Sequence, residues 1–175
     1  MDITYTTSSV EWEYCGEKKK YIAKGVEFAS IEGNKIYIEI CGDFGYEYRY
    51  INLVGENIIW YRDNIEQVIF FISEDDKKIV KLQGLKDVAV MNDKIFVLTF
   101  VTDNGEILEY SKHATMLKKY LPPVNYSFYR FPKMNNDLTV ICQGNEFTID
   151  SFGRNDWKFK YNNRTECWEK ESLSY

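Results

Sequence analysis

The feature that most constrains this chain is an internal repeat. Residues 12–38, WEYCGEKKKYIAKGVEFASIEGNKIYI, align without a gap on residues 71–97, FISEDDKKIVKLQGLKDVAVMNDKIFV, at a constant offset of 59 (71 − 12 = 59). The identical pairs are Lys18/Lys77, Lys19/Lys78, Gly25/Gly84, Lys35/Lys94 and Ile36/Ile95. A period of this size indicates a stacked or radial array of one supersecondary unit. The repeat therefore constrains the architecture, while the chemistry has to be sought elsewhere.

The apolar residues follow the period of β-strands. Residues 35–41 place Ile36, Ile38 and Ile40 on one face, because successive side chains of a strand alternate between faces. Residues 46–51 likewise group three tyrosines on one face. Residues 94–101 are apolar on both faces, which predicts a fully buried strand. Residues 106–111 and 114–120 fit two further strands better than one helix.

Turn residues separate these strands at intervals of roughly ten residues, a spacing typical of all-β sandwiches, barrels and propellers. Asn104-Gly105 is the sharpest hairpin signal, because a type I′ turn needs φ > 0 at both central positions. We therefore predict one all-β, antiparallel domain over residues 1–175. It consists of repeated four-stranded meanders, propeller-like or in an open sandwich or barrel, with units at about 10–63, 69–122 and 124–175.

The third unit is suggested by residues 136–140, which are similar to residues 93–97 at an offset of 43 (136 − 93 = 43). Units of this kind resemble the blades of a β-propeller. The resemblance implies an array of antiparallel meanders. The chain departs from the family's pattern, because it lacks the Gly-His and Trp-Asp pairs of WD40 repeats and the Gly-Gly pair of kelch repeats. It also offers three units, fewer than the 4–8 blades of closed propellers.

Charge and composition restrict the partners. The net charge is −5, and the first 110 residues carry 20 acidic and 12 basic side chains. An acidic surface disfavours nucleic acid, whose phosphates require dense Lys and Arg, and favours a basic partner. The N-terminus shows no signal-peptide pattern and no apolar run approaches the roughly 20 residues of a membrane span. We expect a cytoplasmic protein without membrane contact, with its four cysteines as buried free thiols.

Motifs for catalysis are weak. His113 is the only histidine, and it lies in an expected turn without a Gly-x-Ser-x-Gly sequence nearby. One histidine and four scattered cysteines make a zinc site implausible. The sequence thus predicts no catalytic residue, no cofactor and no metal ligand, and it favours a protein that is not an enzyme.

The C-terminal third interleaves aromatic and basic residues, a pattern that can stack bases or sugars on a β-surface. Simple strand alternation explains it as well. In that interpretation Trp157, Phe159 and Tyr161 face a core, while Lys158 and Lys160 face water and protect an edge strand. The pattern leaves open a partner contact at Trp157 and Trp168.

The sequence therefore favours a non-catalytic protein-interaction module on a β-repeat scaffold. One alternative is an acidic immunity or inhibitor-type protein that neutralises a basic partner. Its candidate contact residues are Glu39, Asp43, Glu47 and Asp75. A second alternative is a carbohydrate-binding or carbohydrate-active protein. A third is a structural protein that forms a homodimer through open sheet edges.

Overall fold

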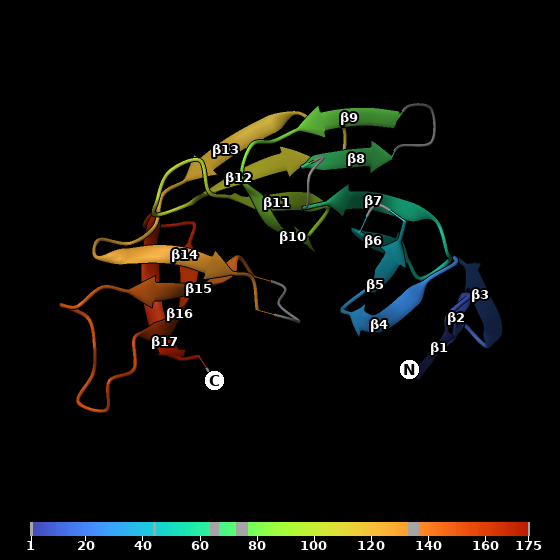
Figure 1. The fold of residues 1–175 in the computed structure, drawn as a ribbon, viewed down its shortest axis with the longest axis horizontal. Coiled ribbons are helices and arrows are strands. Elements are labelled where there is room, and N and C mark those ends of the chain that lie inside the picture. Colours follow the sequence, from blue (N-terminus) through green and yellow to red (C-terminus); the bar gives the residue numbers. More distant parts are fainter. Residues whose placement is uncertain (1, 44, 64–66, 73–76, 133–136, 175) are drawn as a thin grey trace. The chain divides into compact units, whose positions relative to one another are not determined.

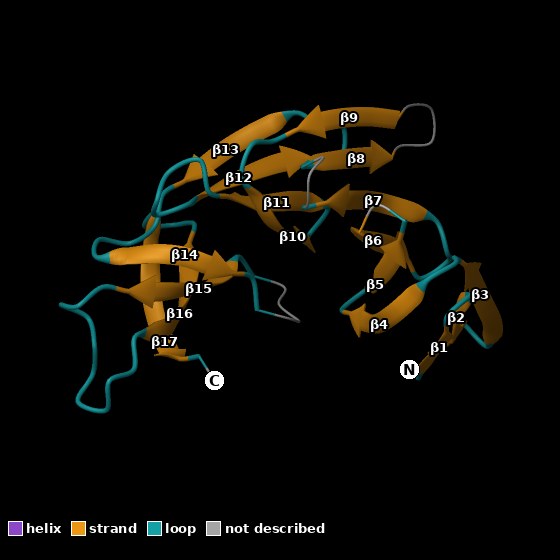
Figure 2. Cartoon of the chain, in the orientation of Figure 1, coloured by secondary structure: helices purple, strands orange, loops and turns teal. Residues whose placement is uncertain are grey.

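The computed structural model describes residues 2–43, 45–63, 67–72, 77–132 and 137–174. Every regular element in these ranges is a β-strand, and all strand pairs are antiparallel (Figures 1 and 2). The prediction of an all-β fold of antiparallel meanders is confirmed. Among the described residues, no helix has the length and apolar character required to cross a membrane.

Within the described ranges, seventeen strands form four sheets, in each of which consecutive strands are neighbours. The first sheet contains β1 (Ile3–Thr6), β2 (Ser9–Tyr14) and β3 (Glu17–Ile22). The second contains β4 (Val26–Glu32), β5 (Lys35–Gly42), β6 (Gly45–Asn52), β7 (Asn57–Arg62), β8 (Val68–Ile72) and β9 (Lys77–Lys81). The third contains β10 (Leu85–Met91), β11 (Lys94–Thr99), β12 (Glu106–Ser111) and β13 (Met116–Tyr120). The fourth contains β14 (Tyr126–Arg130), β15 (Thr139–Gly144), β16 (Asp156–Asn162) and β17 (Cys167–Leu173).

The chain separates into two compact units. Unit 1 comprises Met1–Leu82 with Lys112–Ala114, and unit 2 comprises Gln83–Ser111 with Thr115–Tyr175. Compact units can belong to one domain or to two, so the single domain expected from the sequence stays a prediction.

Each unit has an apolar core between two sheets. In unit 1, Val10 and Trp12 of β2 pack against the β5 residues Ile36, Ile38 and Ile40, which confirms the predicted alternation of β5. In unit 2, β10–β13 and β14–β17 share a core made of Met91, Phe96, Leu98, Ile107, Tyr120, Phe128, Phe131, Leu138, Val140, Cys142, Phe159 and Tyr161. The burial of these side chains is the main favourable term that holds each pair of sheets together.

The repeat seen in the sequence recurs in the strands. An offset of 59 moves β4 onto β10 residue for residue, and it moves β2, β3, β5, β6 and β7 onto β8, β9, β11, β12 and β13 to within two residues at each end. Two register shifts also coincide. One lies between Val26 and Phe28 and recurs 59 residues later in β10, and the other follows Tyr50 and recurs after Glu109. The repeated unit therefore includes its β-bulges.

The identical glycines of the two copies occupy one structural role. Gly25 and Gly84 have φ of +83° and +69°, and their carbonyls accept hydrogen bonds from the N–H groups of Cys41 and Phe100 at 2.8 Å. A Cβ at Gly25 would stand 2.2 Å from the Cys41 carbonyl oxygen. Both the left-handed backbone and the close approach of a neighbouring strand therefore require glycine.

The structure corrects several details of the sequence interpretation. The β8–β9 hairpin, expected within the second unit of residues 69–122, extends the sheet of β4–β7, because β8 pairs with β7 over four residues. β11 and β12 form the predicted hairpin, but six residues connect them, and of Asn104 and Gly105 only Gly105 has positive φ. The expected type I′ turn is therefore wrong. The predicted edge strand β16 is instead central, between β15 and β17.

The cysteines also differ from expectation. All four are free thiols, as predicted, but only Cys142 is buried, whereas Cys15, Cys41 and Cys167 are exposed. Cys15 adopts φ of +53° in the tight turn between β2 and β3, which explains its position at the surface. Burial raises the pKa of the Cys142 thiol far above its usual range, so this group is an inert apolar side chain.

Candidate protein-interaction surface

Strand pairing in unit 1 gathers charged and aromatic side chains on one face of β6–β9. The alternation of β6 sends Tyr46, Tyr48 and Tyr50 to one face and Glu47 and Arg49 to the other. The aromatic face has stacked rings, with Tyr48 and Tyr61 centroids 4.8 Å apart. On the opposite face, the register places Trp60 across from Arg49 and Phe70 across from Trp60.

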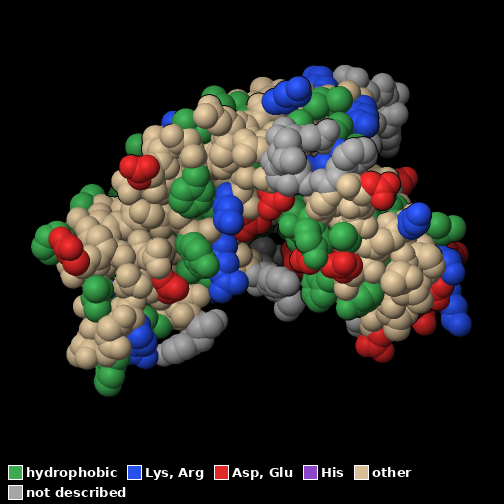
Figure 3. Space-filling model, in the orientation of Figure 1, with side chains coloured by type: hydrophobic (Ala, Val, Ile, Leu, Met, Phe, Trp, Pro, Cys, Tyr) green, Lys and Arg blue, Asp and Glu red, His purple; other side chains and the backbone are tan. Residues whose placement is uncertain are grey.

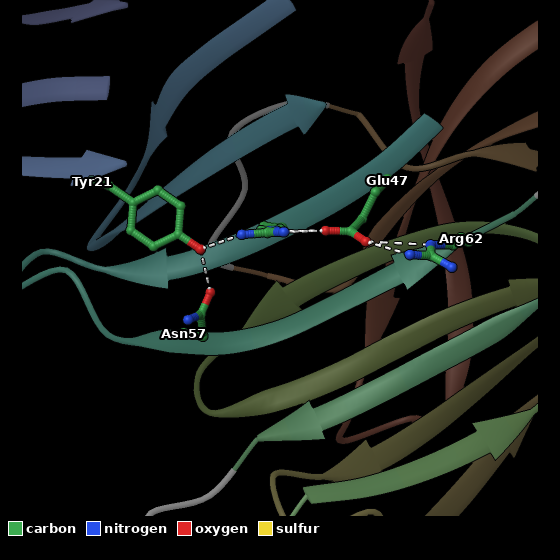
Figure 4. Close-up of polar contacts among 5 residues, drawn as sticks. Tyr21, Glu47, Asn57 and Arg62 are labelled. Carbon is green, nitrogen blue, oxygen red and sulfur yellow. Dashed lines mark hydrogen bonds and ion pairs between the residues drawn. The ribbon is translucent and has the colours of Figure 1, made fainter. Parts of the chain in front are cut away.

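Glu47 forms the centre of a polar chain on that face (Figure 4). Its Oε1 accepts a hydrogen bond from Arg49 Nε at 2.6 Å, and its Oε2 accepts from Arg62 Nη2 at 3.1 Å. Arg49 Nη1 donates to the hydroxyl of Tyr21 at 2.7 Å, and that hydroxyl donates to Asn57 Oδ1 at 2.7 Å. The chain thus links β3, β6 and β7 by charge-assisted hydrogen bonds, which are stronger than neutral ones.

The carboxylate is the most buried member of the chain. Glu47 is 8% exposed, whereas the side chains of Arg49 and Arg62 keep 28% and 24% exposure. Burial disfavours the charge of Arg49, but the hydrogen bond to Tyr21 and the Glu47 carboxylate raise the pKa of Arg49 above its usual value. One carboxylate therefore holds two guanidiniums, which keep their charge as arginines do in proteins and stay partly exposed.

Aromatic rings continue this surface beyond Arg62. Trp60 and Phe70 stack with centroids 3.5 Å apart and planes within 6°. Arg62 Cζ lies 5.3 Å from the Trp60 centroid, and Lys77 Nζ lies 4.7 Å from it. These are cation–π distances. We call Glu47, Arg49, Trp60, Arg62, Phe70 and Lys77 the Arg–Trp strip.

A hollow of about 200 Å³ adjoins the strip at the end of the β5–β6 hairpin. Its walls are formed by Ile40, Gly42, Asp43, Gly45, Glu47, Arg49 and Arg62. The hollow is half-open, and both arginines contribute to its wall. A side chain of a partner could enter it and meet a fixed guanidinium.

The structure brings together two of the four predicted acidic contact residues. Asp43 and Glu47 line the same hollow. Glu39 pairs with Tyr48 and lies on the tyrosine face of the sheet, away from them. Asp75 lies outside the described residues. Of the pair, Glu47 is already bound by two guanidiniums, whereas Asp43 is exposed.

The two predicted tryptophans belong to unit 2 and support its core. Trp168 contacts Tyr161 edge-to-face at 5.1 Å and donates its indole N–H to the Leu121 carbonyl at 2.8 Å. Trp157 packs against the same core, with Lys170 Nζ 3.4 Å from its ring centroid. Phe159 and Tyr161 are buried as the alternation predicts. Packing therefore accounts for the observed positions of both tryptophans.

The sequence raised His113 as a candidate for catalysis and the histidine and cysteines as candidates for metal binding. His113 lies exposed in the turn between β12 and β13. In the part of the chain that the structure describes, no group of three or more His, Cys, Asp and Glu side chains is placed to hold a metal ion.

The sequence reasoning missed Arg49, Trp60, Arg62, Phe70 and Lys77. A signal existed in the strand 45–52, where Glu47 and Arg49 alternate with three tyrosines and so must share the other face. The partner residues could not be found in this way. They depend on the pairing of β7 with β8, which the repeat alignment alone does not reveal.

The molecular surface carries side chains of both charges. On the face seen in Figure 3, acidic and basic side chains lie interspersed among apolar ones.

Comparison with known protein families and with curated proteins finds no match to this chain. The candidate site therefore rests on its own geometry.

Proposed function

We propose that this chain is a non-catalytic protein-binding module and that the Arg–Trp strip is its contact surface. The observation that supports this most directly is the pairing of one nearly buried carboxylate, Glu47, with two partly exposed guanidiniums beside a stacked Trp60–Phe70 pair. Tryptophan, tyrosine and arginine are the residue types that dominate binding energy at protein interfaces. The strip concentrates tryptophan and arginine on the adjacent strands β6 and β7.

Pre-organisation strengthens the proposal. Binding orders flexible side chains at a cost of about 0.5–1.5 kcal/mol for each one immobilised. Arg49 and Arg62 are already oriented by Glu47, so a partner would lose less free energy in meeting them. A guanidinium presents a planar fork that fits a carboxylate. A partner that offers Asp, Glu or a chain-terminal carboxylate to this face is therefore favoured.

The partner at this strip differs in charge from the basic partner considered from the sequence. Arg49, Arg62 and Lys77 outweigh Glu47 and Asp43, so the strip with its hollow has an excess of one positive charge (3 − 2 = 1). In this proposal Glu47 positions the arginines and does not contact a partner itself. The separate interpretation from the sequence, in which Glu39, Asp43, Glu47 and Asp75 contact a basic partner, stays a prediction.

The carbohydrate alternative receives less support from the strip. A sugar-binding platform needs an open aromatic face. One face of Trp60 is covered by Phe70, and the cations of Arg62 and Lys77 lie close to the same ring. The same arrangement suits a protein partner, which can bury the partly exposed Trp60 together with the cations, while Phe70, 9% exposed, supports the Trp60 ring from within the chain.

The proposal can be tested by quantitative affinity capture from the native host, with the purified wild-type chain and two variants as bait. Trp60→Ala and Arg62→Gln should each remove the same subset of captured proteins. Arg164→Gln is the matched control, since it removes one guanidinium from the exposed turn before β17 in the other unit. Identical capture by all four baits would refute the strip as a contact surface. A glycan array with the same four proteins would reveal sugar binding instead.

A further inference from the structure

The outer edge of strand β7 is occupied by strand β8 of the same chain. It pairs with β8 through Ile59↔Phe71, Trp60↔Phe70, Tyr61↔Ile69 and Arg62↔Val68. β8 is the first strand of the hairpin that opens the second copy of the repeat. The backbone groups of β7 therefore gain a ladder of hydrogen bonds from the copy that follows it.

Strand β1 reproduces this pairing at the start of the first copy. It pairs with β2 through Ile3↔Trp12, Thr4↔Glu11, Tyr5↔Val10 and Thr6↔Ser9. Adding 59 to the β2 residues gives 71, 70, 69 and 68, which are the β8 residues that pair with β7. Residues 3–6 of β1 therefore pair with β2 at the positions equivalent to those at which residues 59–62 of β7 pair with β8. The letters agree in part, because Ile3 matches Ile59 and Tyr5 matches Tyr61.

Strand β13 is the equivalent of β7 in the second copy, and its outer edge carries no strand in the described part of the chain. The offset of 59 places residues 118–120 at the positions of 59–61. β13 exposes two apolar side chains, Met116 at 58% and Leu117 at 51%. An edge strand with exposed apolar side chains is a template for pairing with another strand. In the first copy of the repeat, the equivalent edge of β7 pairs with β8, so a strand equivalent to β8 should fit the edge of β13.

We propose that β13 binds strand β2 of a second copy of this chain, after β1 of that copy is released. The register of β7 and β8 then places Lys118 opposite Trp12, Lys119 opposite Glu11, and Tyr120 opposite Val10. Lys119, which pairs with Glu106 of β12 in this structure, and Glu11 have opposite charges, and directly opposed unlike charges stabilise an antiparallel pair. Leu121 follows at the end of this ladder, and its carbonyl also accepts the indole N–H of Trp168.

The exchange gives up a short strand. β1 is four residues long and three of them are exposed; its release breaks the packing of Ile3 against the unit 1 core and the edge contact of Tyr5 with Phe28, whose ring centroids are 6.2 Å apart. Glu11 is paired with Lys20 at 2.6 Å, and both side chains are about half-exposed, so this ion pair is weak. One ladder on β2 replaces another. This inference is independent of the Arg–Trp strip, which lies on a sheet face and not on this edge.

The first test measures self-association by sedimentation equilibrium. The double variant Thr4→Pro/Tyr5→Pro removes two consecutive N–H groups of β1. Neighbouring N–H groups of a strand point to opposite sides, so one of the two must face β2. We expect this variant to self-associate at least about tenfold more tightly than wild type. Circular dichroism should show an unchanged β spectrum.

Charge reversal then identifies the edge. In the Thr4→Pro/Tyr5→Pro background, Lys119→Glu should weaken association at least tenfold, and a further Glu11→Lys should restore it. The matched control is Lys86→Glu, an exposed lysine on β10. A double variant that stays monomeric at about 1 mM would overturn the proposal, as would equal effects of Lys119→Glu and Lys86→Glu.

The second test avoids proline. Two versions of the chain, both with Cys15, Cys41 and Cys167 replaced by serine, carry either Glu11→Cys or Lys119→Cys. After mixing and mild oxidation, a disulfide-linked heterodimer is expected, because directly opposed Cβ atoms approach disulfide range. Glu17→Cys in place of Glu11→Cys lies beyond this ladder and should not cross-link with Lys119→Cys. Equal yields from the two pairs, or no heterodimer at all, would contradict the assigned register.

Discussion

The hydroxyl of Tyr120 donates a hydrogen bond to Oε2 of Glu109, and both side chains are buried in unit 2. The other carboxylate oxygen of Glu109 lies 2.6 Å from Lys94 Nζ. Each oxygen of this buried carboxylate thus faces a donor, which offsets the cost of removing its charge from water. Glu109 occupies the repeat position of Tyr50, so the second copy has exchanged an aromatic ring for a carboxylate.

Tyr120→Phe should destabilise the fold by about 1–3 kcal/mol, because it leaves one oxygen of a buried carboxylate without its donor. Urea unfolding followed by tryptophan fluorescence measures the change. Glu109→Gln and the double variant complete a double-mutant cycle. A coupling free energy above about 0.5 kcal/mol is expected for side chains in direct contact. Additive effects would show that the hydrogen bond contributes no coupling.

The same pair predicts a loss of stability in alkali. Burial and the hydrogen bond to Glu109 raise the pKa of Tyr120 well above the usual value of about 10. The folded state therefore keeps this proton where the unfolded state releases it, and the stabilisation, complete below pH 10, declines as the pH rises toward the raised pKa.

The measurement is the difference in unfolding free energy between wild type and Tyr120→Phe at several pH values from 8 to 11. We expect the difference to shrink above pH 10, because the phenylalanine has no proton to release. The other tyrosines are common to both proteins and cancel in the difference. A constant difference across this range would contradict the raised pKa.

The sequence predicted the strands better than the sheets. The alternation along β5 and the bounds of β12, residues 106–111, follow from the local sequence pattern, and the structure confirms them. Sheet membership depends on pairing between distant residues, which periodicity does not encode. The β8–β9 hairpin thus extends the preceding sheet, although its sequence aligns with β2–β3. The identical Gly25 and Gly84 were the most informative local signal of the repeat, because both glycines serve the same geometric role.

The candidate site shows the same limit. Glu47 was selected as an acidic contact residue, yet its two guanidinium partners come from its own strand and from β7. The sequence gives the number of acidic residues, but it does not show which side chains lie next to them in the fold. The sequence therefore identified one residue of the Arg–Trp strip and suggested a different role for it.

Replacement of the repeated glycines should be costly at both positions. Gly25→Ala and Gly84→Ala place a Cβ against the backbone of Cys41 and Phe100, at 2.2 and 2.7 Å. Gly153 is the matched control, because its φ of +77° imposes the same backbone strain while nothing lies within 4 Å of its Cβ position. We expect about 1 kcal/mol for Gly153→Ala and at least twice that for the other two, by urea unfolding. Equal losses would show that the close approach is unimportant.

The ion cluster of the Arg–Trp strip predicts a difference between buried and exposed carboxylates. Glu47→Gln should cost about 1–3 kcal/mol, because it leaves two partly buried guanidiniums without a counter-charge. Glu11→Gln is the control, since its pair with Lys20 is exposed to solvent and should contribute little to stability. Thermal and urea unfolding of both variants provide the comparison. A Glu11→Gln variant as destabilised as Glu47→Gln would contradict the organising role of Glu47.

The loop between β15 and β16 predicts a response to acid that one arginine controls. Asp150 Oδ2 accepts a hydrogen bond from Arg154 Nε at 2.8 Å, and Oδ1 accepts from the Phe152 N–H at 2.8 Å. The side chain of Arg154 contributes most to the lowered pKa of Asp150, so loop order is present at neutral pH and declines as the pH falls through that lowered pKa.

Arg154→Gln should move the Asp150 pKa back toward its usual value in an NMR titration of the carboxyl carbon. It should also speed amide exchange at Phe152. Lys158→Gln, whose lysine pairs with Glu171, should leave both quantities unchanged. An Asp150 titration that is the same in wild type and Arg154→Gln would show that the backbone donors alone fix this loop.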